Sequence, residues 1–296
     1  MSKSIDTLLT DIFSLLATGG HEPDAENLKA LTHSISEAIT GALKEENDLS
    51  PRAELRLSKT GTPLRKVWFE HNYKFANKSE LDPNEVGPNL MRFLTGHITE
   101  AVLLFLAREA GHTVEQEQKT VTVAGIDGHL DAVIDGHLVD VKTASQFGYD
   151  KFKTADIVWG KDPFGYIQQL SAYKKGLLNS GVELKPNSYF WANNKSNSEM
   201  FLTLEEDAHI VDAEALLTAQ KEAVKSPSPP EALCYPEEEA GKSGNMKVND
   251  QCKYCPFKYE CFKNANDGQG LRVFKYAKGP EFLTKVIDKP KVEEIT

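Results

Sequence analysis

Two aspartates and a lysine near the middle of the sequence have types and spacing that could hold a divalent metal ion. Asp131, Asp140 and Lys142 lie within the run GHLDAVIDGHLVDVK of residues 128–142. Two carboxylates that face each other on a largely apolar sheet repel unless a cation lies between them. Oxygen ligands are the ones that hard divalent cations prefer. The alternative is an exposed hairpin face that only carries charge.

A two-residue hairpin would bring these side chains together. Asp135 and Gly136 separate two runs of alternating apolar residues, and a type I′ turn needs positive φ at both central positions. If the residues that flank this turn pair with each other, Asp131 lies directly opposite Asp140, and Lys142 shares their face. The apolar residues next to these charged residues in the sequence are then expected on the opposite face: Leu130, Ala132, Val139 and Val141.

Two predicted helices could contribute further polar groups. Glu100 lies inside an apolar helix predicted over residues 88–111 and largely buried, where a carboxylate is costly unless it is paired or bound to metal. Gln169 and Tyr173 are four residues apart on a helix predicted from Pro163 to Asn179, so they share a face. Together they could orient a phosphate or a water molecule. A structural ion pair and a buried polar pair are the alternatives.

A basic segment precedes these helices. Between residues 51 and 66, five basic side chains stand against one acidic side chain, a local charge of +4 in a chain of net charge -10. Side chains and backbone amides in such a segment are suited to contact phosphate. The candidates for these contacts are Arg56, Ser58, Lys59 and Arg65. A solvated turn that leads into a helix is the alternative.

The four cysteines all fall in the last quarter of the chain: Cys234, Cys252, Cys255 and Cys261. Disulfide-stabilised domains usually spread their cysteines through a short chain, so this clustering favours a metal site. Four thiolates suit either tetrahedral zinc or an iron–sulfur cluster, and the spacing alone favours zinc. In either case the expected role is structural.

Composition limits the class of protein. Hydrophobic residues make up 40% and charged residues 26% of the 296 residues, which is ordinary for a soluble globular protein. The net charge of -10 argues against a protein that coats nucleic acid by bulk electrostatics, although a local basic patch remains compatible with DNA binding. Without a long apolar run or a signal-peptide layout, we expect a cytoplasmic protein that does not enter a membrane.

The pattern of apolar residues predicts three segments. Residues 1–50 are expected to form a helical N-terminal appendage of two amphipathic helices, residues 51–225 the core, and residues 226–296 a C-terminal cysteine segment. Strands are predicted over residues 119–123, 129–134, 137–143, 188–193 and 200–204, and a further helix over residues 208–224. No strand is predicted beyond residue 225.

These residues, in this order, resemble the PD-(D/E)XK nuclease superfamily and, within it, the RecB-like branch. The matching elements are the helix residue Glu100, the hairpin residue Asp131, Asp140-Val-Lys142, Gln169-Leu-Ser-Ala-Tyr173 and the C-x2-C-x5-C tail from Cys252 to Cys261. The tail is similar to that of AddB-type nucleases and CRISPR-associated RecB-like exonucleases. The runs LRLSKTG of residues 55–61 and GKDPFG of residues 160–165 resemble the version carried by tailed phages. Leu130 stands where the family name has proline.

The resemblance, which covers roughly residues 52–275, implies a fold, a reaction and cofactors. The implied fold is α/β, a restriction-endonuclease-like core with a mixed central sheet flanked by helices. The implied reaction is hydrolysis of DNA phosphodiester bonds, most often by an exonuclease that acts on ends or single strands. The implied ligands of one or two Mg²⁺ or Mn²⁺ ions are Glu100, Asp131, Asp140 and the Val141 carbonyl. Lys142 would stabilise developing charge, and Gln169 and Tyr173 would orient water or the DNA backbone.

The resemblance also favours a [4Fe–4S] cluster over zinc at the cysteines. Relatives with such a cluster usually have one cysteine before the core, whereas Cys234 is the only candidate here for the fourth ligand. A recombination or single-strand-binding protein is the implied protein partner. Three alternatives stay open: a non-catalytic DNA-binding or assembly module, an endonuclease of the same superfamily, and a zinc-stapled interaction protein.

Overall fold

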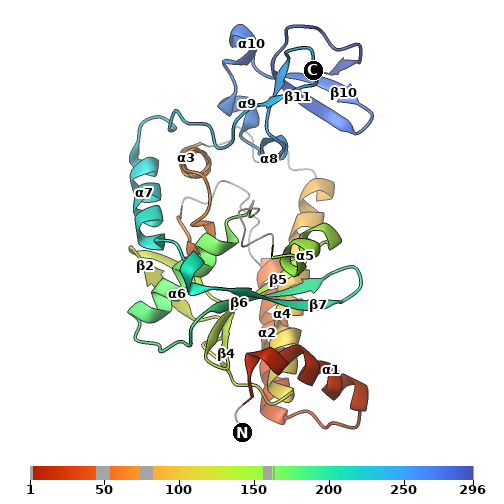
Figure 1. Ribbon diagram of the computed structural model, residues 1–296, viewed down its shortest axis with the longest axis vertical. Helices are drawn as coiled ribbons and strands as arrows, with labels where there is room; N and C mark the ends of the chain where they lie inside the picture. The colour runs from red at the N-terminus through yellow and green to blue at the C-terminus, as the bar shows by residue number, and fades with distance from the viewer. Residues whose placement is uncertain (1–2, 45–53, 74–82, 156–161, 163, 296) are drawn as a thin grey trace. The chain divides into compact units, whose positions relative to one another are not determined.

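The computed structural model describes residues 3–44, 54–73, 83–155, 162 and 164–295 (Figure 1). The chain divides into two units, each made from two separate stretches of sequence. The first unit contains residues 1–62 and 74–221, and the second contains residues 63–73 and 222–296. The N-terminal helices therefore belong to the first unit, and a short helical segment from the basic region belongs to the second.

A mixed five-stranded sheet forms the centre of the first unit. Its strands are β1 (Val114–Glu115), β4 (Ala132–Ile134), β5 (His137–Ala144), β6 (Ser188–Asn194) and β7 (Met200–Glu205). They lie in the order β1-β4-β5-β6-β7, and only β5 and β6 pair in parallel. The expected α/β class with a mixed central sheet flanked by helices is confirmed.

The hairpin that joins β4 and β5 has the predicted turn. Asp135 and Gly136 have φ values of 50° and 87°, as the type I′ turn requires. Ile134 pairs with His137, so the predicted register is confirmed. This register places every second residue of β5 on one face of the sheet, which is how the hairpin positions the functional side chains.

The strand predicted over residues 129–134 is divided in the structure. Its first residue belongs to β3 (Ile126–His129), which pairs with β2 (Thr120–Val123) in a separate two-stranded sheet. The backbone N–H of Leu130 bonds to the Lys119 carbonyl, so the chain changes its pairing partner just before Asp131. Leu130 consequently packs in the same core as Leu138, and the prediction that it faces the other way with Val141 is wrong.

The two faces of the central sheet are covered by different cores. On one face, Leu138 of β5 packs with Leu170 of α6 (Tyr166–Asn179). On the other face, Val139 of β5 packs with Trp191 of β6 and Leu104 of α4 (Pro83–Glu109). Helices α4 and α6 lie on opposite sides of the strands (Figure 1).

The first helices take part in the core. The segment η1 (Ile5–Thr7) continues into α1 (Leu8–Thr18), and α2 (Ala25–Lys44) follows after a break at two glycines with positive φ. The two predicted helices are therefore confirmed. Their description as an appendage needs correction, because Ile5, Leu8 and Ile12 are buried beside Trp191 in the second core. Burial of each such side chain is worth about 1.5–3 kcal/mol.

Helix α4 is buried over only part of its length. Leu103, Leu104 and Ala107 lie in the core, whereas Met91 and Phe93 remain 59% and 68% exposed. The prediction of a largely buried helix is therefore wrong for its N-terminal half. Among the described residues, Leu90–Glu109 is the one helical stretch that passes a membrane-span test of length and composition.

The remaining elements of the first unit surround α6. They are η2 (Leu57–Lys59), α5 (Gln146–Lys153), η3 (Asp207–His209) and α7 (Ala213–Lys225), which runs on into the second unit. Gly61 and Gly165 bring the segment after η2 close to the start of α6, since a Cβ on Gly61 would lie 2.4 Å from the Cα of Gly165. The predicted helix start at Pro163 lies outside the described residues.

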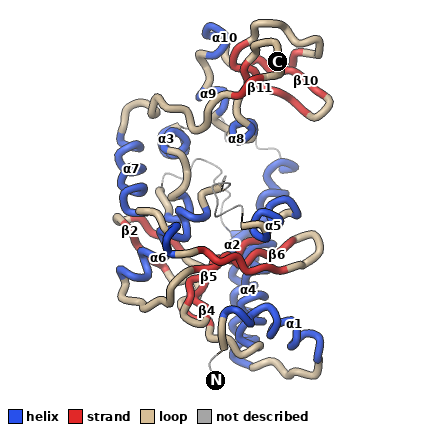
Figure 2. The backbone as a smooth tube through the Cα atoms, viewed as in Figure 1, coloured by secondary structure: helices blue, strands red, loops and turns tan. Residues whose placement is uncertain are grey.

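The second unit contains a sheet that the sequence did not predict. Strands β8 (Glu238–Glu239), β9 (Met246–Lys247), β10 (Arg272–Tyr276), β11 (Gly279–Lys285) and β12 (Glu294–Ile295) lie in the antiparallel order β12-β10-β11-β9-β8. Three short helices lie in this unit: α8 (Asp250–Lys253), α9 (Lys258–Cys261) and α10 (Ala265–Gly268) (Figure 2). Cys252 belongs to α8 and Cys261 to α9. Helix α3 (Leu64–Asn72) completes the unit.

Candidate functional site

The hairpin and α4 bring three carboxylates and a lysine together in the first unit. Asp140 and Lys142 point from β5 toward the α6 face, Asp131 immediately precedes β4, and Glu100 lies on α4. The four side chains lie close enough that the charge of each shifts the pKa of at least one of the others. We call this group, Glu100, Asp131, Asp140 and Lys142, the carboxylate site.

Lys142 is the centre of the polar contacts in this site. Its Nζ lies 2.7 Å from Asp140 Oδ2 and donates to Gln169 Oε1 at 3.3 Å. The ammonium also stands 4.6 Å from the centre of the Tyr166 ring, a cation–π contact. Burial lowers the pKa of Lys142, but the nearby Asp140 and Asp131 carboxylates more than offset this and raise it above its ordinary value. The side chain therefore stays a cation.

The three carboxylates lie in an environment that disfavours their joint ionisation. Burial, and then the charges of Asp140 and Glu100, raise the pKa of Asp131 well above its usual range. Burial likewise raises the pKa of Asp140 despite the adjacent Lys142. Burial and the charge of Asp140 raise the pKa of Glu100 to about 7. One lysine does not compensate one buried and two half-buried acids, so the site favours added positive charge.

The donor set of the carboxylate site fits a hard divalent cation. Asp140 is 1% exposed, and its buried Oδ1 atom has no hydrogen-bond partner among the described residues. A buried carboxylate oxygen of this kind is suited to bind a cation. Asp131 Oδ2 accepts the backbone N–H of Val141 at 2.6 Å, which fixes this carboxylate beside β5. Within the described residues, no three His, Cys, Asp or Glu side chains converge closely enough to form a metal cage as they stand.

Helix α6 supplies the amide and the phenol that the sequence predicted on one face. Gln169 accepts from Lys142, and its Nε2 donates to the Tyr173 hydroxyl at 3.1 Å. Burial raises the pKa of Tyr173, so its phenol stays neutral. Gly128 allows this packing, since a Cβ there would lie 2.6 Å from Leu57 Cβ and 3.1 Å from the Tyr173 ring. The structure thus joins Gln169 and Tyr173 to the carboxylate site through Lys142.

Gln118 is a contact of the carboxylate site that sequence reasoning missed. Its side-chain amide donates to Glu100 Oε1, and its backbone N–H donates to the Asp131 carbonyl at 3.1 Å. It lies in the turn between β1 and β2 with a φ of 50°. No spacing rule identifies a single glutamine in a loop, so the sequence held no signal for it.

The four candidate phosphate contacts are divided between the two units, three in the first and one in the second. Arg56, Ser58 and Lys59 are exposed at η2 in the first unit. Arg65 belongs to α3 in the second unit, where its guanidinium donates to the carbonyls of Pro230 and Cys261 and, at 3.0 Å, to Cys261 Sγ. The structure brings the first three together and engages Arg65 with the cysteine segment.

The four cysteines are free thiols that lie near one another in the second unit. We call them the cysteine site: Cys234, Cys252, Cys255 and Cys261. Burial, helped by the neighbouring sulfur atoms, raises the pKa of Cys252 to about 12. Burial also raises the pKa values of Cys234 and Cys255, although backbone N–H groups of Lys66 and Phe257 donate to their respective sulfur atoms. Such donors stabilise thiolates, the form that binds metal.

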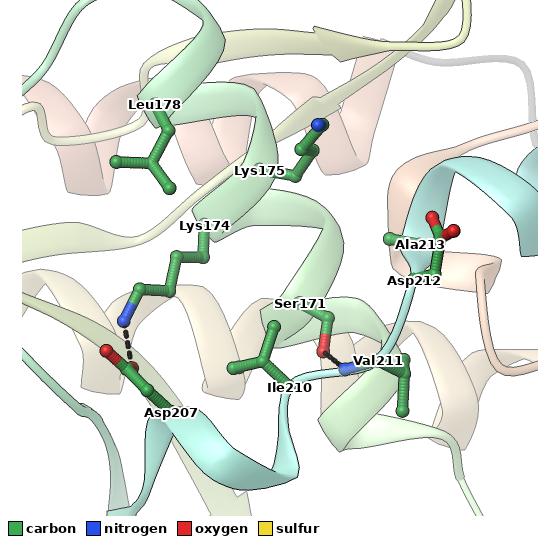
Figure 3. A pocket seen from close by; sticks show the side chains of 9 residues that line it. All are labelled: Ser171, Lys174, Lys175, Leu178, Asp207, Ile210, Val211, Asp212 and Ala213. Atoms are coloured by element: carbon green, nitrogen blue, oxygen red, sulfur yellow. Dashed lines mark hydrogen bonds and ion pairs between the residues drawn. The ribbon is translucent and has the colours of Figure 1, made fainter.

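A pocket of about 330 Å³ lies on another side of α6 (Figure 3). Its polar groups are already paired, since Lys174 contacts Asp207 and the Ser171 hydroxyl accepts the Val211 N–H at 3.1 Å. Neither Gln169 nor any residue of the carboxylate site lines it. The pocket is therefore separate from the candidate chemistry.

Comparisons with known proteins give one structural neighbour to report. No family model and no curated protein matches this chain. The crystal structure of SSO0001 is similar with a TM-score of 0.39 and 16% sequence identity, over 76% of this chain and 92% of that one. A likeness of this degree says nothing of the function of the carboxylate site.

Proposed function

We propose that this protein is a metal-dependent DNA nuclease of the PD-(D/E)XK superfamily, RecB-like branch, and most specifically an exonuclease acting in the cytoplasm in phage or bacterial DNA replication, recombination or repair. The observation that carries the proposal is the hairpin, which sets Asp131 beside Asp140 and directs Lys142 to the same place. Glu100 adds a third carboxylate from α4. These are residues that the resemblance identifies, and they come from two separate stretches of sequence, α4 and the β4–β5 hairpin.

In this proposal, Asp131, Asp140 and Glu100 would hold one or two Mg²⁺ or Mn²⁺ ions, together with the Val141 carbonyl. When bound, the metal lowers the pKa of a water molecule and offsets charge on the phosphate. The buried Oδ1 of Asp140 supports this assignment, because it has no hydrogen-bond partner in the part of the chain that the structure describes. No three potential ligands within the described residues converge as a cage, so the ligands would close around the metal, the phosphate or both.

The raised pKa of Lys142, which keeps its side chain charged beside Asp140 and Asp131, supports a role for this residue in the proposed reaction. Its ammonium would stabilise negative charge that develops on the phosphate oxygens, an effect that is strong where water is excluded. Gln169 orients Lys142, because its amide oxygen accepts from Lys142 while its amide nitrogen donates to the Tyr173 hydroxyl. In the proposed reaction, Gln169 and Tyr173 therefore act mainly through the lysine. Arg56, Ser58 and Lys59 are the proposed phosphate contacts.

The cysteine site is proposed to hold a structural [4Fe–4S] cluster, with zinc as the alternative. The N–H groups directed at Cys234 and Cys255, and the guanidinium of Arg65 at Cys261, support a set of thiolates there. Arg65 is then a neighbour of the metal centre and no longer a proposed phosphate contact.

A non-catalytic DNA-binding module is the second candidate. The specific observation in its favour is that no three potential ligands in the described part of the chain converge as a metal cage. Such a module would bind DNA with the same salt dependence as a nuclease. It would leave the DNA intact in every metal.

The deciding experiment follows end-labelled linear DNA, both single- and double-stranded, and covalently closed circles in Mg²⁺, Mn²⁺ or EDTA. Asp140→Asn removes a charge without changing shape, and Asp127→Asn, exposed on β3, is the matched control. We expect loss of linear DNA that EDTA and Asp140→Asn abolish and Asp127→Asn preserves. Cutting of closed circles would identify an endonuclease. Binding without metal-dependent cleavage by the wild type would overturn the nuclease and leave the module.

A further inference from the structure

The turn between β1 and β2 has an unusual backbone. Gln116 and Gln118 both have positive φ, at 55° and 50°, a conformation that non-glycine residues seldom adopt. The Lys119 N–H closes the turn on the Gln116 carbonyl at 3.1 Å. Such backbone strain persists only where surrounding contacts over-determine it, and it concentrates at functional sites.

Two side chains of this turn attach it to one face of α4. Glu117 pairs with Arg108, and Gln118 donates to Glu100. Glu100 and Arg108 are eight residues apart, close to two helical turns, so they project from the same side of the helix. The turn therefore runs along the helix that carries Glu100 and is held at two points.

The same turn is also tied to the hairpin. The Gln118 backbone N–H donates to the Asp131 carbonyl at 3.1 Å, and the Lys119 carbonyl accepts the Leu130 N–H at 3.2 Å. These bonds lie where the chain changes its pairing partner, just before β4. Gln118 is thus the one described residue that bonds both to the Glu100 carboxylate and to the backbone of Asp131.

We propose that Gln118 is a positioning residue that holds Glu100 in register with Asp131 for metal binding. The inference rests on the proposed function and adds a residue that lies outside the motifs from which it was built. Glu100 lies on α4, and Asp131 lies just before β4, where the Val141 N–H holds its carboxylate. These two elements are separate in the sequence, and Gln118 bonds to both of them, to the Glu100 carboxylate and to the Asp131 carbonyl.

The expected size of the effect follows from where Gln118 lies. Groups that hydrogen-bond to a metal ligand typically change metal affinity about 10- to 100-fold when they are removed. The Gln118 side chain is exposed, so water can replace part of its bond to Glu100. We therefore expect a change near the lower end, about tenfold.

Gln118→Asn is the informative variant. Asparagine tolerates positive φ, so the turn and its backbone bond to Asp131 are kept, while the shorter side chain no longer reaches Glu100. Gln116→Ala is the matched control, because it changes the same residue type in the same turn at the same sign of φ. Thermal unfolding of both variants checks that the fold is intact.

Mn²⁺ binding is measured without DNA, from the electron paramagnetic resonance signal of the free ion, and cleavage is measured against Mn²⁺ concentration. For Gln118→Asn we expect about tenfold weaker Mn²⁺ binding, an equal rise in the Mn²⁺ concentration for half-maximal cleavage, and recovery of kcat at saturating Mn²⁺. KM for DNA should stay at the wild-type value.

Two outcomes would overturn the positioning role: Mn²⁺ binding equal to that of the wild type and Gln116→Ala, or a loss of kcat that excess Mn²⁺ does not restore. Failure of the proposed function itself looks different, because the wild type would then show neither Mn²⁺ binding nor cleavage.

Discussion

The carboxylate site and the cysteine site are assembled in contrasting ways. Asp131 and Asp140 are brought together by a single turn of two residues, and their separation in the sequence is short. The cysteine site instead draws on α3, and the bond from Arg65 to Cys261 joins residues 196 positions apart. A local pattern thus builds one site, and a long-range contact completes the other.

The two sites also differ in how charge is arranged. The carboxylate site gathers three acids around one lysine, and burial raises the pKa of each acid. The cysteine site directs backbone amides and a guanidinium at its sulfur atoms. In the proposed function, the first arrangement would hold a hard cation on oxygen, and the second would hold a softer metal on sulfur. The comparison predicts that the two sites respond separately to substitution.

The largest effect is expected at Lys142. Its replacement by methionine removes the ammonium but keeps the length of the side chain. We expect kcat to fall about 10²- to 10³-fold, the usual loss when one group that stabilises transition-state charge is removed. Single-turnover cleavage of end-labelled DNA measures this, with Lys153→Met on α5 as control. The metal content of the cysteine site should not change. A fall in that content would show that the two sites do not respond independently.

An intermediate effect is expected from pH on the metal-free protein. Because burial and Asp140 raise the pKa of Glu100 from 4.5 to about 7, the folded protein keeps a proton in this window that the unfolded chain releases. Stability should therefore fall as pH rises from 5 to 8, by about 1–3 kcal/mol. Urea unfolding in EDTA at both pH values measures it.

Glu100→Gln should reduce that dependence on pH, whereas Glu115→Gln, exposed on β1, should leave it unchanged. Part of the slope should remain in Glu100→Gln, since the pKa values of Asp131 and Asp140 are raised in the same direction. A stability that rises between pH 5 and 8 would contradict the charge arrangement described for this site.

The smallest effects are expected from two arginines that the sequence grouped together. Arg65→Met should weaken the second unit by about 1.5 kcal/mol and reduce the metal content of the cysteine site. Arg56→Met should instead lower DNA affinity and reduce the salt slope of binding by about one. Metal analysis and visible absorbance, which separates iron–sulfur from colourless zinc, measure the first, and salt-dependent DNA binding measures the second. If both variants changed metal content and DNA binding in the same way, the assignment of Arg65 to the cysteine site and of Arg56 to DNA would be wrong.

Local patterns predicted the parts of the fold that local physics determines. The turn at Asp135 and Gly136 was predictable because positive φ at both positions strongly selects those residue types. The register and the shared face of Asp140 and Lys142 then follow from the period of two in a strand. The parallel pairing of β5 with β6, in contrast, depends on contacts that no local spacing records.

The features that sequence reasoning missed depend on distant partners or on single residues. Strands β8 and β9 contain two residues each, too few to show any alternation. Leu130 was assigned to the wrong face because the switch of its backbone bond to Lys119 has no signature in composition. Arg65 was grouped with its neighbours in sequence, although its partners are Pro230 and Cys261.

Helix α3 has a consequence for the order in which the protein is made. Its Val67 and Phe69 are buried, and Phe69 stacks on Phe257 at 5.5 Å. A ribosome adds about 5–20 residues per second, so α3 waits about 10–40 s after its own synthesis before Cys261 is made. During that interval its apolar face has no native cover from the second unit. The last quarter of the chain, produced alone, would therefore lack α3, because that helix of the second unit lies at residues 64–72.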